Sequence, residues 1–199
     1  MIRGIDADLI TPDKLMTSSD MARLGCRHCD GCSECCTDRA EAITLDAWDI
    51  RMLKEGLNYS FEGLLGSSLI TLRVVDGVIL PCLSVKEGEK QECVFLQEDG
   101  KCAVHPFRPG ICRMFPLARI WREDGSFSYF LQAGECRQPD GVKIRISKWL
   151  EYPNIRAYEE SVRKFHDALT ALRGEMKKDL SHEEQVRLQR QFLEQWFIR

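Results

Sequence analysis

Five cysteines stand within eleven residues near one end of the chain, and no other stretch restricts its folding as strongly. The stretch reads Cys26-Arg-His-Cys29-Asp-Gly-Cys32-Ser-Glu-Cys35-Cys36, and its first four cysteines are three residues apart. Gly31 and Ser33 let such a loop turn, so that thiols at this spacing can converge on one point. A bound metal lowers the pKa of thiols and holds them as thiolates. The stretch therefore predicts a site for a thiolate-binding metal.

A second set of cysteines follows after a long interval. Cys93, Cys102 and Cys112 are separated by eight and nine residues, and Cys136 comes later. Structural zinc takes four nitrogen or sulfur ligands in a tetrahedron, usually from two close pairs. The Cys29-x-x-Cys32 pair with a distant pair would meet that need.

An iron–sulfur cluster is the other inorganic solution. It takes three cysteines at two-residue gaps and a remote fourth, often beside a proline. Cys29, Cys32 and Cys35 have that spacing, and Cys112, close to Pro109, is a candidate for the fourth. The dense run and the surplus of thiols favour the cluster over zinc. Adjacent side chains diverge, so we expect Cys36 to serve a second metal or to be buried.

Composition limits the functional classes. The chain has 199 residues, ten cysteines, 30% charged residues and a formal charge of -3. This balance argues against general nucleic-acid binding, and no apolar run approaches the length of a membrane span. A cytoplasmic location is expected, where thiols stay reduced and many cysteines indicate metal ligation rather than disulfides. The net charge does not exclude a local basic patch, which four arginines could form: Arg108, Arg113, Arg119 and Arg122.

Local signals predict an α+β fold. We expect a short turn over residues 21–24, a helix capped by Thr44 and ended by Gly56, and a helix capped by Ser60. Hairpins are predicted around Asp76-Gly77 and Asp99-Gly100. Further expected elements are a helical turn over residues 109–116, strands at 117–122 and 126–132, a helix from about 147 to Gly174, and a last helix with a Ser181/Glu184 capping box.

We thus expect a loop-rich cysteine core with short antiparallel hairpins, flanked by N-terminal helices and by two C-terminal helices. We predict a cysteine-cluster domain with an N-terminal arm over residues 1–145, and a helical extension over residues 146–199 packed on it. Arg108 and Arg113 flank Cys112, where they would neutralise thiolate charge, bind an anionic substrate or form structural ion pairs. His105 remains unassigned as a ligand.

Three segments together resemble the YkgJ-type cysteine-cluster family, described as a zinc- or iron-chelating domain. They are the Cys-x-x-Cys-x-x-Cys-Cys loop from Cys29, the segment CVFLQEDGKCAVHPFRPGICRMFPL from Cys93, and YFLQAGEC ending at Cys136. The resemblance covers about residues 26–137, and within that range Cys26 and Cys82 are not part of the family's cysteine pattern. It implies that the metal ligands lie among Cys29, Cys32, Cys35, Cys36, Cys93, Cys102, Cys112 and Cys136.

The first hypothesis is therefore a metal-binding protein that holds an iron–sulfur cluster, such as a 4Fe–4S cluster, or zinc. A domain of similar type occurs in flagellin lysine methylases, so the alternative is a protein-modifying enzyme that performs methyl transfer or redox chemistry at the metal. A third hypothesis is an interaction module whose C-terminal helices dock a protein partner.

Overall fold

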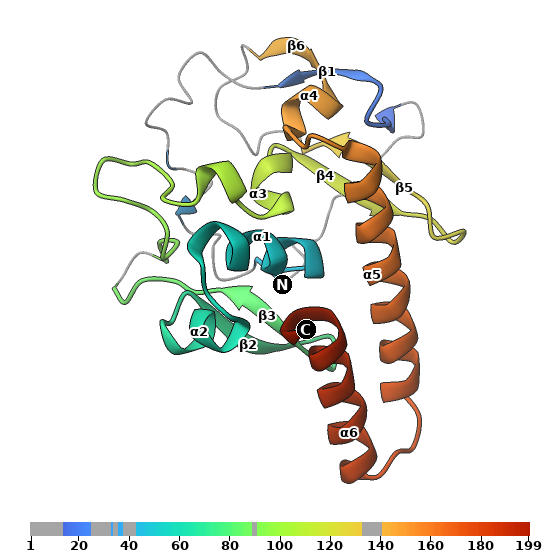
Figure 1. Ribbon diagram of the computed structural model, residues 1–199. Helices are drawn as coiled ribbons and strands as arrows, with labels where there is room; N and C mark the ends of the chain where they lie inside the picture. The colour runs from blue at the N-terminus through green and yellow to red at the C-terminus, as the bar shows by residue number, and fades with distance from the viewer. Residues whose placement is uncertain (1–13, 25–32, 34–35, 38–42, 89–90, 133–140) are drawn as a thin grey trace.

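The computed structural model describes residues 14–24, 33, 36–37, 43–88, 91–132 and 141–199, and Figure 1 shows their arrangement. The fold is α+β, as the sequence predicts. In chain order the elements are β1 (Met21–Leu24), α1 (Ala47–Leu57), α2 (Phe61–Gly66), β2 (Ile70–Val75), β3 (Val78–Leu83), a 3-10 helix (His105–Phe107), α3 (Gly110–Met114), β4 (Leu117–Trp121), β5 (Phe127–Leu131), β6 (Val142–Arg145), α4 (Ile146–Leu150), α5 (Ile155–Met176), α6 (His182–Leu193) and a π-helical turn (Glu194–Ile198). Of the helices in these ranges, none has the length and apolar character that a membrane span requires.

The strands of the described residues form three antiparallel ribbons of two strands each: β1–β6, β2–β3 and β4–β5. The turn between β2 and β3 is made by Asp76 and Gly77, whose φ angles are 51° and 80°. Positive φ at both central residues is what a two-residue hairpin of this type requires. The predicted hairpins at Asp76-Gly77 and between β4 and β5 are both confirmed.

The hairpin predicted around Asp99-Gly100 is reduced to a turn. The Gln97 amide donates to the Lys101 carbonyl at 2.8 Å, and a single bridge joins Leu96 to Cys102. Each arm bends away after that bridge, because the Leu96 amide bonds the Cys93 carbonyl and the His105 amide bonds the Cys102 carbonyl. No strand forms at residues 94–96 or 102–104.

Residues 21–24 form strand β1, so the turn predicted there is wrong. Ala22 and Leu24 are buried while Met21 and Arg23 are exposed, which is the two-residue alternation of a strand. The partner strand β6 lies far along the chain, with Leu24 opposite Val142. Local sequence could not reveal this pairing.

Helix α1 begins and ends later than predicted. Asp46, not Thr44, is its N-cap, and the Asp46 and Asp49 side chains form a reciprocal capping box. Thr44 instead bridges Cys82 on β3. Gly56 lies inside the helix, where a Cβ would meet the ring of Phe107 at 2.5 Å. The glycine therefore makes room for the segment between Cys102 and Cys112 rather than ending the helix.

The remaining helix predictions hold at their caps, but the single helix predicted from about 147 to Gly174 is divided into α4 and α5 by residues 151–154, where Glu151 has a φ of 56°. Ser60 caps α2, and the Ser181/Glu184 capping box begins α6. Helix α5 continues past Gly174 to Met176, and the short α4 precedes it. The apolar stripe predicted for α5 is its buried face: Tyr158, Val162, Phe165, Leu169 and Leu172.

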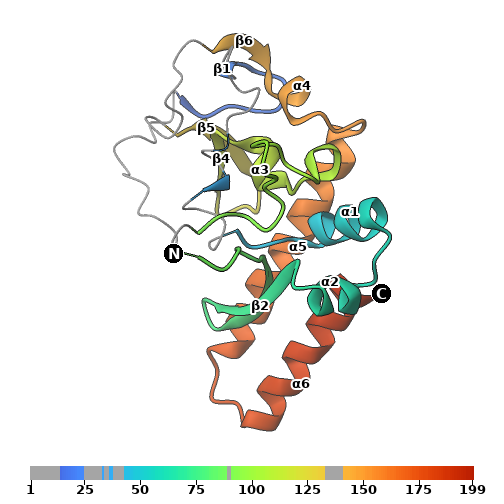
Figure 2. The same cartoon turned by 90° about the vertical axis from the view of Figure 1, so that its left-hand side faces the viewer.

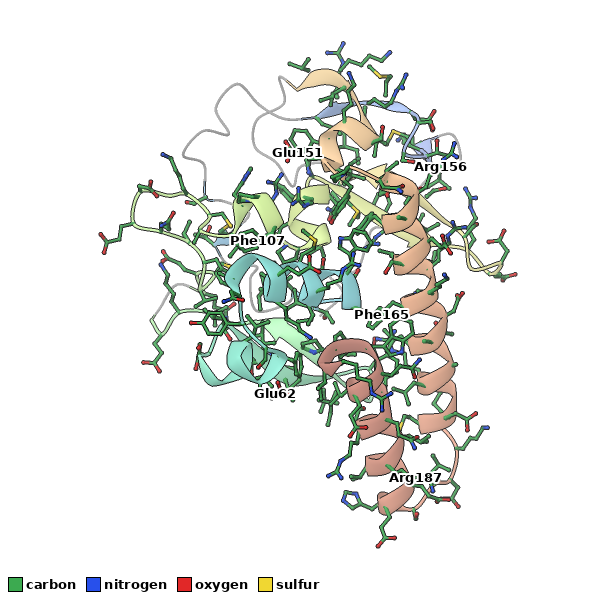
Figure 3. All side chains as sticks on the ribbon, in the orientation of Figure 1. Glu62, Phe107, Glu151, Arg156, Phe165 and Arg187 are labelled. Atoms are coloured by element: carbon green, nitrogen blue, oxygen red, sulfur yellow. The ribbon has the colours of Figure 1, made fainter. Side chains whose placement is uncertain are left out.

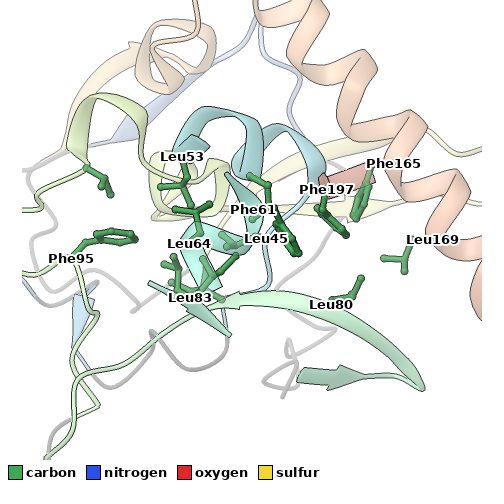
Figure 4. Close-up of a cluster of buried hydrophobic side chains, with 14 of the residues drawn as sticks. Leu45, Leu53, Phe61, Leu64, Leu80, Leu83, Phe95, Phe165, Leu169 and Phe197 are labelled. Atoms are coloured by element: carbon green, nitrogen blue, oxygen red, sulfur yellow. The ribbon is translucent and has the colours of Figure 1, made fainter. Parts of the chain in front are cut away.

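Two hydrophobic cores share α5 as a common wall. In the first, α1, α2 and the β2–β3 hairpin pack against the second half of α5 and against α6, with Leu45, Leu53 and Leu64 fully buried (Figure 4). In the second, β1, β4, β5, α3 and α4 pack around Tyr158 and Val162. Figure 2 shows α5 beside both groups of elements and α6 folded back along it. The boundary at residue 145 stays a prediction, although α4 starts at Ile146.

Candidate metal centre

Four of the eight predicted ligands lie in the described part of the chain: Cys36, Cys93, Cys102 and Cys112. The other four lie outside the described residues, as does Cys26: Cys29, Cys32, Cys35 and Cys136. The structure can therefore show how the backbone brings the two sets of cysteines together.

Cys36, at the end of the near stretch, is joined directly to Cys93. The Cys93 amide donates a hydrogen bond of 2.8 Å to the Cys36 carbonyl, and the Cys36 amide donates to the Ser33 carbonyl. Cys93 also forms a bridge with Val85 and is only 5% exposed. The near stretch is thus tied by its backbone to the first distant cysteine.

Cys102 lies one turn away from Cys93. The Leu96 amide bonds the Cys93 carbonyl at 3.0 Å, and Leu96 itself bridges Cys102. The turn at residues 97–101 closes this short loop, at the place where the sequence predicts a hairpin around Asp99-Gly100. Cys36, Cys93 and Cys102 consequently share one continuous backbone framework.

Cys112 belongs to α3, which packs on the same region. Cys36, Cys102 and Cys112 are half-buried and contact the first core, of which Cys93 is a member. The position of α3 is set from outside the cysteine set, because the amide of Gly110 donates a 2.7 Å hydrogen bond to Asp49 of α1. The fold therefore brings cysteines from three separate segments into contact with this core.

Asp49 is a residue that the sequence analysis missed. It is 3% exposed, and burial together with the neighbouring Asp46 carboxylate raises its pKa to about 8. A Cβ on Gly110 would collide with the Tyr158 hydroxyl, so α3 sits tightly between α1 and α5. The Asp-x-x-Asp spacing before an apolar run could have signalled the cap, but not the bond to α3.

Arg108 and Arg113 form a structural ion pair with one carboxylate. Their guanidinium nitrogens lie 3.3 and 3.6 Å from Glu151 Oε2, and Figure 3 shows Glu151 where α4 ends. Arg113 is 4% exposed, donates to the Pro106 carbonyl and lies over the Tyr152 ring. Of the alternatives drawn from the sequence, the structure favours the ion pair.

The predicted basic patch is not formed by the other two arginines either. Arg119 lies among aromatic rings, 5.6 Å from the Phe127 centroid, and its charge acts on Asp46 and Asp49. Arg122 donates to the Ser128 hydroxyl at 2.6 Å. Of the four arginines, Arg122 alone is exposed, while Arg113 is buried and Arg108 and Arg119 are half-buried, so the four do not form one open cationic surface.

Cys82 behaves differently from the predicted ligands. It is 2% exposed on β3, with its sulfur 3.9 Å from the Thr44 hydroxyl, and burial raises the pKa of its thiol. A raised pKa disfavours the thiolate that metals bind. This agrees with leaving Cys82 out of the ligand set.

The four described cysteines are suitable ligands for a metal, but they would form only part of its site. Within the described ranges, no three His, Cys, Asp or Glu side chains are grouped so that they could hold a metal ion. A four-ligand site in this arrangement would draw at least two ligands from the segments outside those ranges. The cysteines at 29, 32, 35 and 136 are the candidates.

The β1–β6 ribbon pairs the chain just before the near-cysteine stretch with the chain that follows Cys136. Leu24 and Val142 are the last pair of its register. The near-cysteine stretch begins directly after Leu24, and Cys136 stands six residues before Val142. The chain entering one cysteine segment therefore runs beside the chain leaving the other.

A comparison with protein families matches residues 28–137 to the family described as "CxxCxxCC: Putative zinc- or iron-chelating domain". The match covers more than half of the chain. The chain belongs to this family. The CxxCxxCC family description supports metal binding and includes both zinc and iron, in agreement with the sequence prediction. Searches of curated proteins and of solved structures found no match.

Proposed function

We propose that the protein binds an iron–sulfur cluster through thiolates from the near stretch and the distant set. The candidate ligands remain the eight predicted from the sequence: Cys29, Cys32, Cys35, Cys36, Cys93, Cys102, Cys112 and Cys136. The observation that carries the proposal is the 2.8 Å backbone hydrogen bond between Cys93 and Cys36, which joins the two sets.

The spacing of the near cysteines supports a cluster over zinc. Three cysteines at two-residue gaps with a remote fourth are typical of iron–sulfur ligation, whereas a zinc site uses two close pairs. Eight candidate thiols also exceed the need of one zinc ion. Zinc held by four of them is the alternative.

The surroundings of the described cysteines also support a buried centre. Cys93 lies within the first core, beside Phe95 and Leu96, which are 5% and 7% exposed. Apolar walls limit access of water and thereby influence the reduction potential of a bound cluster. Such a centre would carry out electron transfer, or hold together a region with little regular secondary structure.

Metal analysis of protein purified without oxygen tests the proposal. We expect iron, a matching amount of acid-labile sulfide, and a broad visible absorption band. Zinc without sulfide or colour would replace the cluster by the zinc alternative. Protein with neither metal, whose cysteines are paired in disulfides, would contradict the proposal.

Enzymatic methyl transfer or redox catalysis has no separate observation in its favour. Binding of an anionic substrate by Arg108 and Arg113 was one of three alternatives drawn from the sequence, and both side chains are paired with Glu151. A protein substrate and a cytoplasmic location remain predictions from the sequence.

A further inference from the structure

The β1–β6 ribbon carries a basic face that the sequence does not reveal. Its register places Met21 opposite Arg145 and Arg23 opposite Lys143, and all four side chains are exposed. Residues directly opposite one another project from the same face of a ribbon. Three cations and one thioether therefore share this face. In the views of Figures 1 and 2, β6 is the outermost strand at the end of the molecule opposite α6.

The hydrogen-bond pattern makes the charge repulsion worse. The Ile146 amide donates to the Asp20 carbonyl, so that this pair is hydrogen-bonded. Bonded and non-bonded pairs alternate along an antiparallel ribbon, which makes Arg23 opposite Lys143 a non-bonded pair. Side chains of such pairs are the closer ones, and like charges directly opposite each other are destabilising.

No carboxylate in the described ranges compensates these charges. Among the described residues, no carboxylate lies within 4.0 Å of Arg23, Lys143 or Arg145, and none forms a hydrogen bond with their side chains. The neighbouring Asp20 carboxylate is occupied by the amide and hydroxyl of Thr17, at 2.7 and 2.8 Å. The ribbon thus keeps an unfavourable charge arrangement that an anionic partner would relieve.

The backbone of β6 offers a second recognition element. In a non-bonded pair, the amide and carbonyl of Lys143 point away from β1. β6 pairs with β1 alone among the strands of the described segments, and no backbone hydrogen bond from elsewhere in them reaches Lys143. An open edge of this kind can accept an added strand.

We propose that the β6 edge docks an extended acidic segment of a partner protein. The segment pairs with the backbone of Lys143, and its carboxylates at alternate positions lie against Lys143 and Arg145, with Arg23 on the neighbouring strand. Alternate residues of an extended strand share one face, as the two β6 cations do. The proposal does not depend on the identity of the bound metal.

Charge and composition favour a protein partner over other polyanions. The chain carries a net charge of -3, and the face offers only three cations, too few for the many phosphate contacts that nucleic-acid affinity needs. Met21 is the one apolar side chain on the face, which is too little for insertion into a membrane. Acidic carboxylates on an extended peptide match both the charge and the open edge.

Fluorescence anisotropy with the full chain tests the proposal. The probe is a labelled short peptide in which glutamate alternates with valine, and its control carries lysine in place of glutamate. We expect the glutamate peptide alone to bind, and binding to weaken severalfold between about 50 and about 300 mM salt. No binding at about 1 mM protein, or equal binding of both peptides, would overturn the proposal.

Charge-reversed variants locate the surface. Lys143→Glu with Arg145→Glu is expected to weaken binding about tenfold or more, since two exposed charge pairs are lost and repulsion replaces them. The matched control is Arg187→Glu with Arg190→Glu on α6, at the far end of the molecule (Figure 3), where both side chains are exposed. Equal weakening by both double variants would show a general charge effect and would refute the docking surface.

Lys143→Pro separates strand pairing from charge. Proline removes the outward amide and is tolerated on an edge strand, whereas Lys143→Ala removes the charge and keeps the amide. We expect the proline variant to bind about fivefold more weakly than the alanine variant, which one lost hydrogen bond explains. Equal binding would refute strand addition. A single-stranded oligonucleotide or an anionic lipid vesicle that binds through the same residues in place of the peptide would overturn the assignment to a protein partner.

Discussion

At the scale of single residues, the position of α3 depends on a close contact that leaves no free space. Gly110 lies against the hydroxyls of Tyr158 and Tyr152, whose rings stack at 3.9 Å, and its amide bonds the Asp49 carboxylate. Side chains in protein interiors are packed as densely as organic crystals, so that even one added methyl group is felt. Cys112 is two residues after Gly110 on α3, so this contact also fixes the position of Cys112.

Gly110→Ala should destabilise the protein by about 1–3 kcal/mol, because the new Cβ would collide with the Tyr158 hydroxyl. Gly174→Ala is the matched control: no atom lies within 4 Å of its Cβ position, and alanine favours the helix by about 1 kcal/mol. Urea unfolding of both variants measures the effects. A Gly110→Ala protein as stable as the wild type would show that α3 can move freely.

Asp49 should make stability depend on pH. Its pKa in the folded protein, about 8, lies above the ordinary value of 3.8, mainly because of burial. Between these values the folded protein holds a proton that the unfolded chain has released, so rising pH lowers the free energy of unfolding. Asp49→Asn cannot titrate, but its amide oxygen can still accept from Gly110.

The measurement for Asp49 is the difference in unfolding free energy between wild type and Asp49→Asn. We expect this difference to shift against the wild type from about pH 4 to about pH 8, since only the wild type must release a proton there. Arg119 stays protonated over this range in both proteins, whereas Asp46 interacts with Asp49, so the pH-dependent difference belongs to the Asp46–Asp49 pair. Parallel pH profiles would contradict the raised pKa.

At the scale of elements, α6 is attached to the β2–β3 hairpin by the side-chain amide of Gln189. This amide forms the two hydrogen bonds with Ile79 that the backbone of a neighbouring strand would form. The Ile79 amide donates to Gln189 Oε1, and Gln189 Nε2 donates to the Ile79 carbonyl, both at 2.9 Å. Gln189 is 6% exposed, so water cannot readily replace the hydrogen bonds between its side chain and Ile79. The C-terminal helices are thus joined to the hairpin by hydrogen bonds as well as by the first core.

Gln189→Leu should destabilise the protein by about 1–3 kcal/mol, because the backbone groups of Ile79 lose their partners in a buried place. Hydrogen exchange at the Ile79 amide should speed up together with the loss of stability. Gln191→Leu, on the exposed face of the same helix, is the control and should change stability by less than about 0.5 kcal/mol. Unchanged protection of Ile79 would mean that this bond does not hold α6 in place.

At the scale of the whole molecule, the proposed metal centre joins segments that are far apart in the chain. Cys36 and Cys93 meet through their backbones, and β1 and β6 bring together the chain on either side of the remaining cysteines. A metal that binds such ligands only in the folded state contributes its binding free energy to folding. Metal loss and loss of global stability should therefore occur together.

Cys93→Ala should reduce the metal content strongly and lower the midpoint of unfolding, because a predicted ligand is lost. Cys82→Ala removes an equally buried thiol that lies outside the predicted set, and should keep the metal at a cost of about 1 kcal/mol. Elemental analysis and urea unfolding measure both effects. Full metal content in Cys93→Ala would remove Cys93 from the ligand set.

Elements whose signals lie in neighbouring residues could be predicted from the amino-acid sequence. Capping residues at Ser60 and Ser181, the Asp76-Gly77 turn and the buried stripe of α5 were all predictable, because caps, turns and helical periodicity depend on neighbouring residues. The family and its cysteine pattern could also be recognised, since the spacing of the candidate ligands is a property of the sequence. The expected helix end at Gly56 failed because the close approach of Phe107, and not local propensity, explains that glycine.

Contacts between residues that are distant in the sequence follow from the packing of whole elements. The pairing of β1 with β6, the bond from Gly110 to Asp49 and the ion pairs of Arg108 and Arg113 with Glu151 each join segments that no local signal connects. The same cause explains why the predicted arginine patch is absent and a basic face appears on the ribbon instead. Long-range contacts depend on how whole elements pack, because each element must bury its apolar face against another.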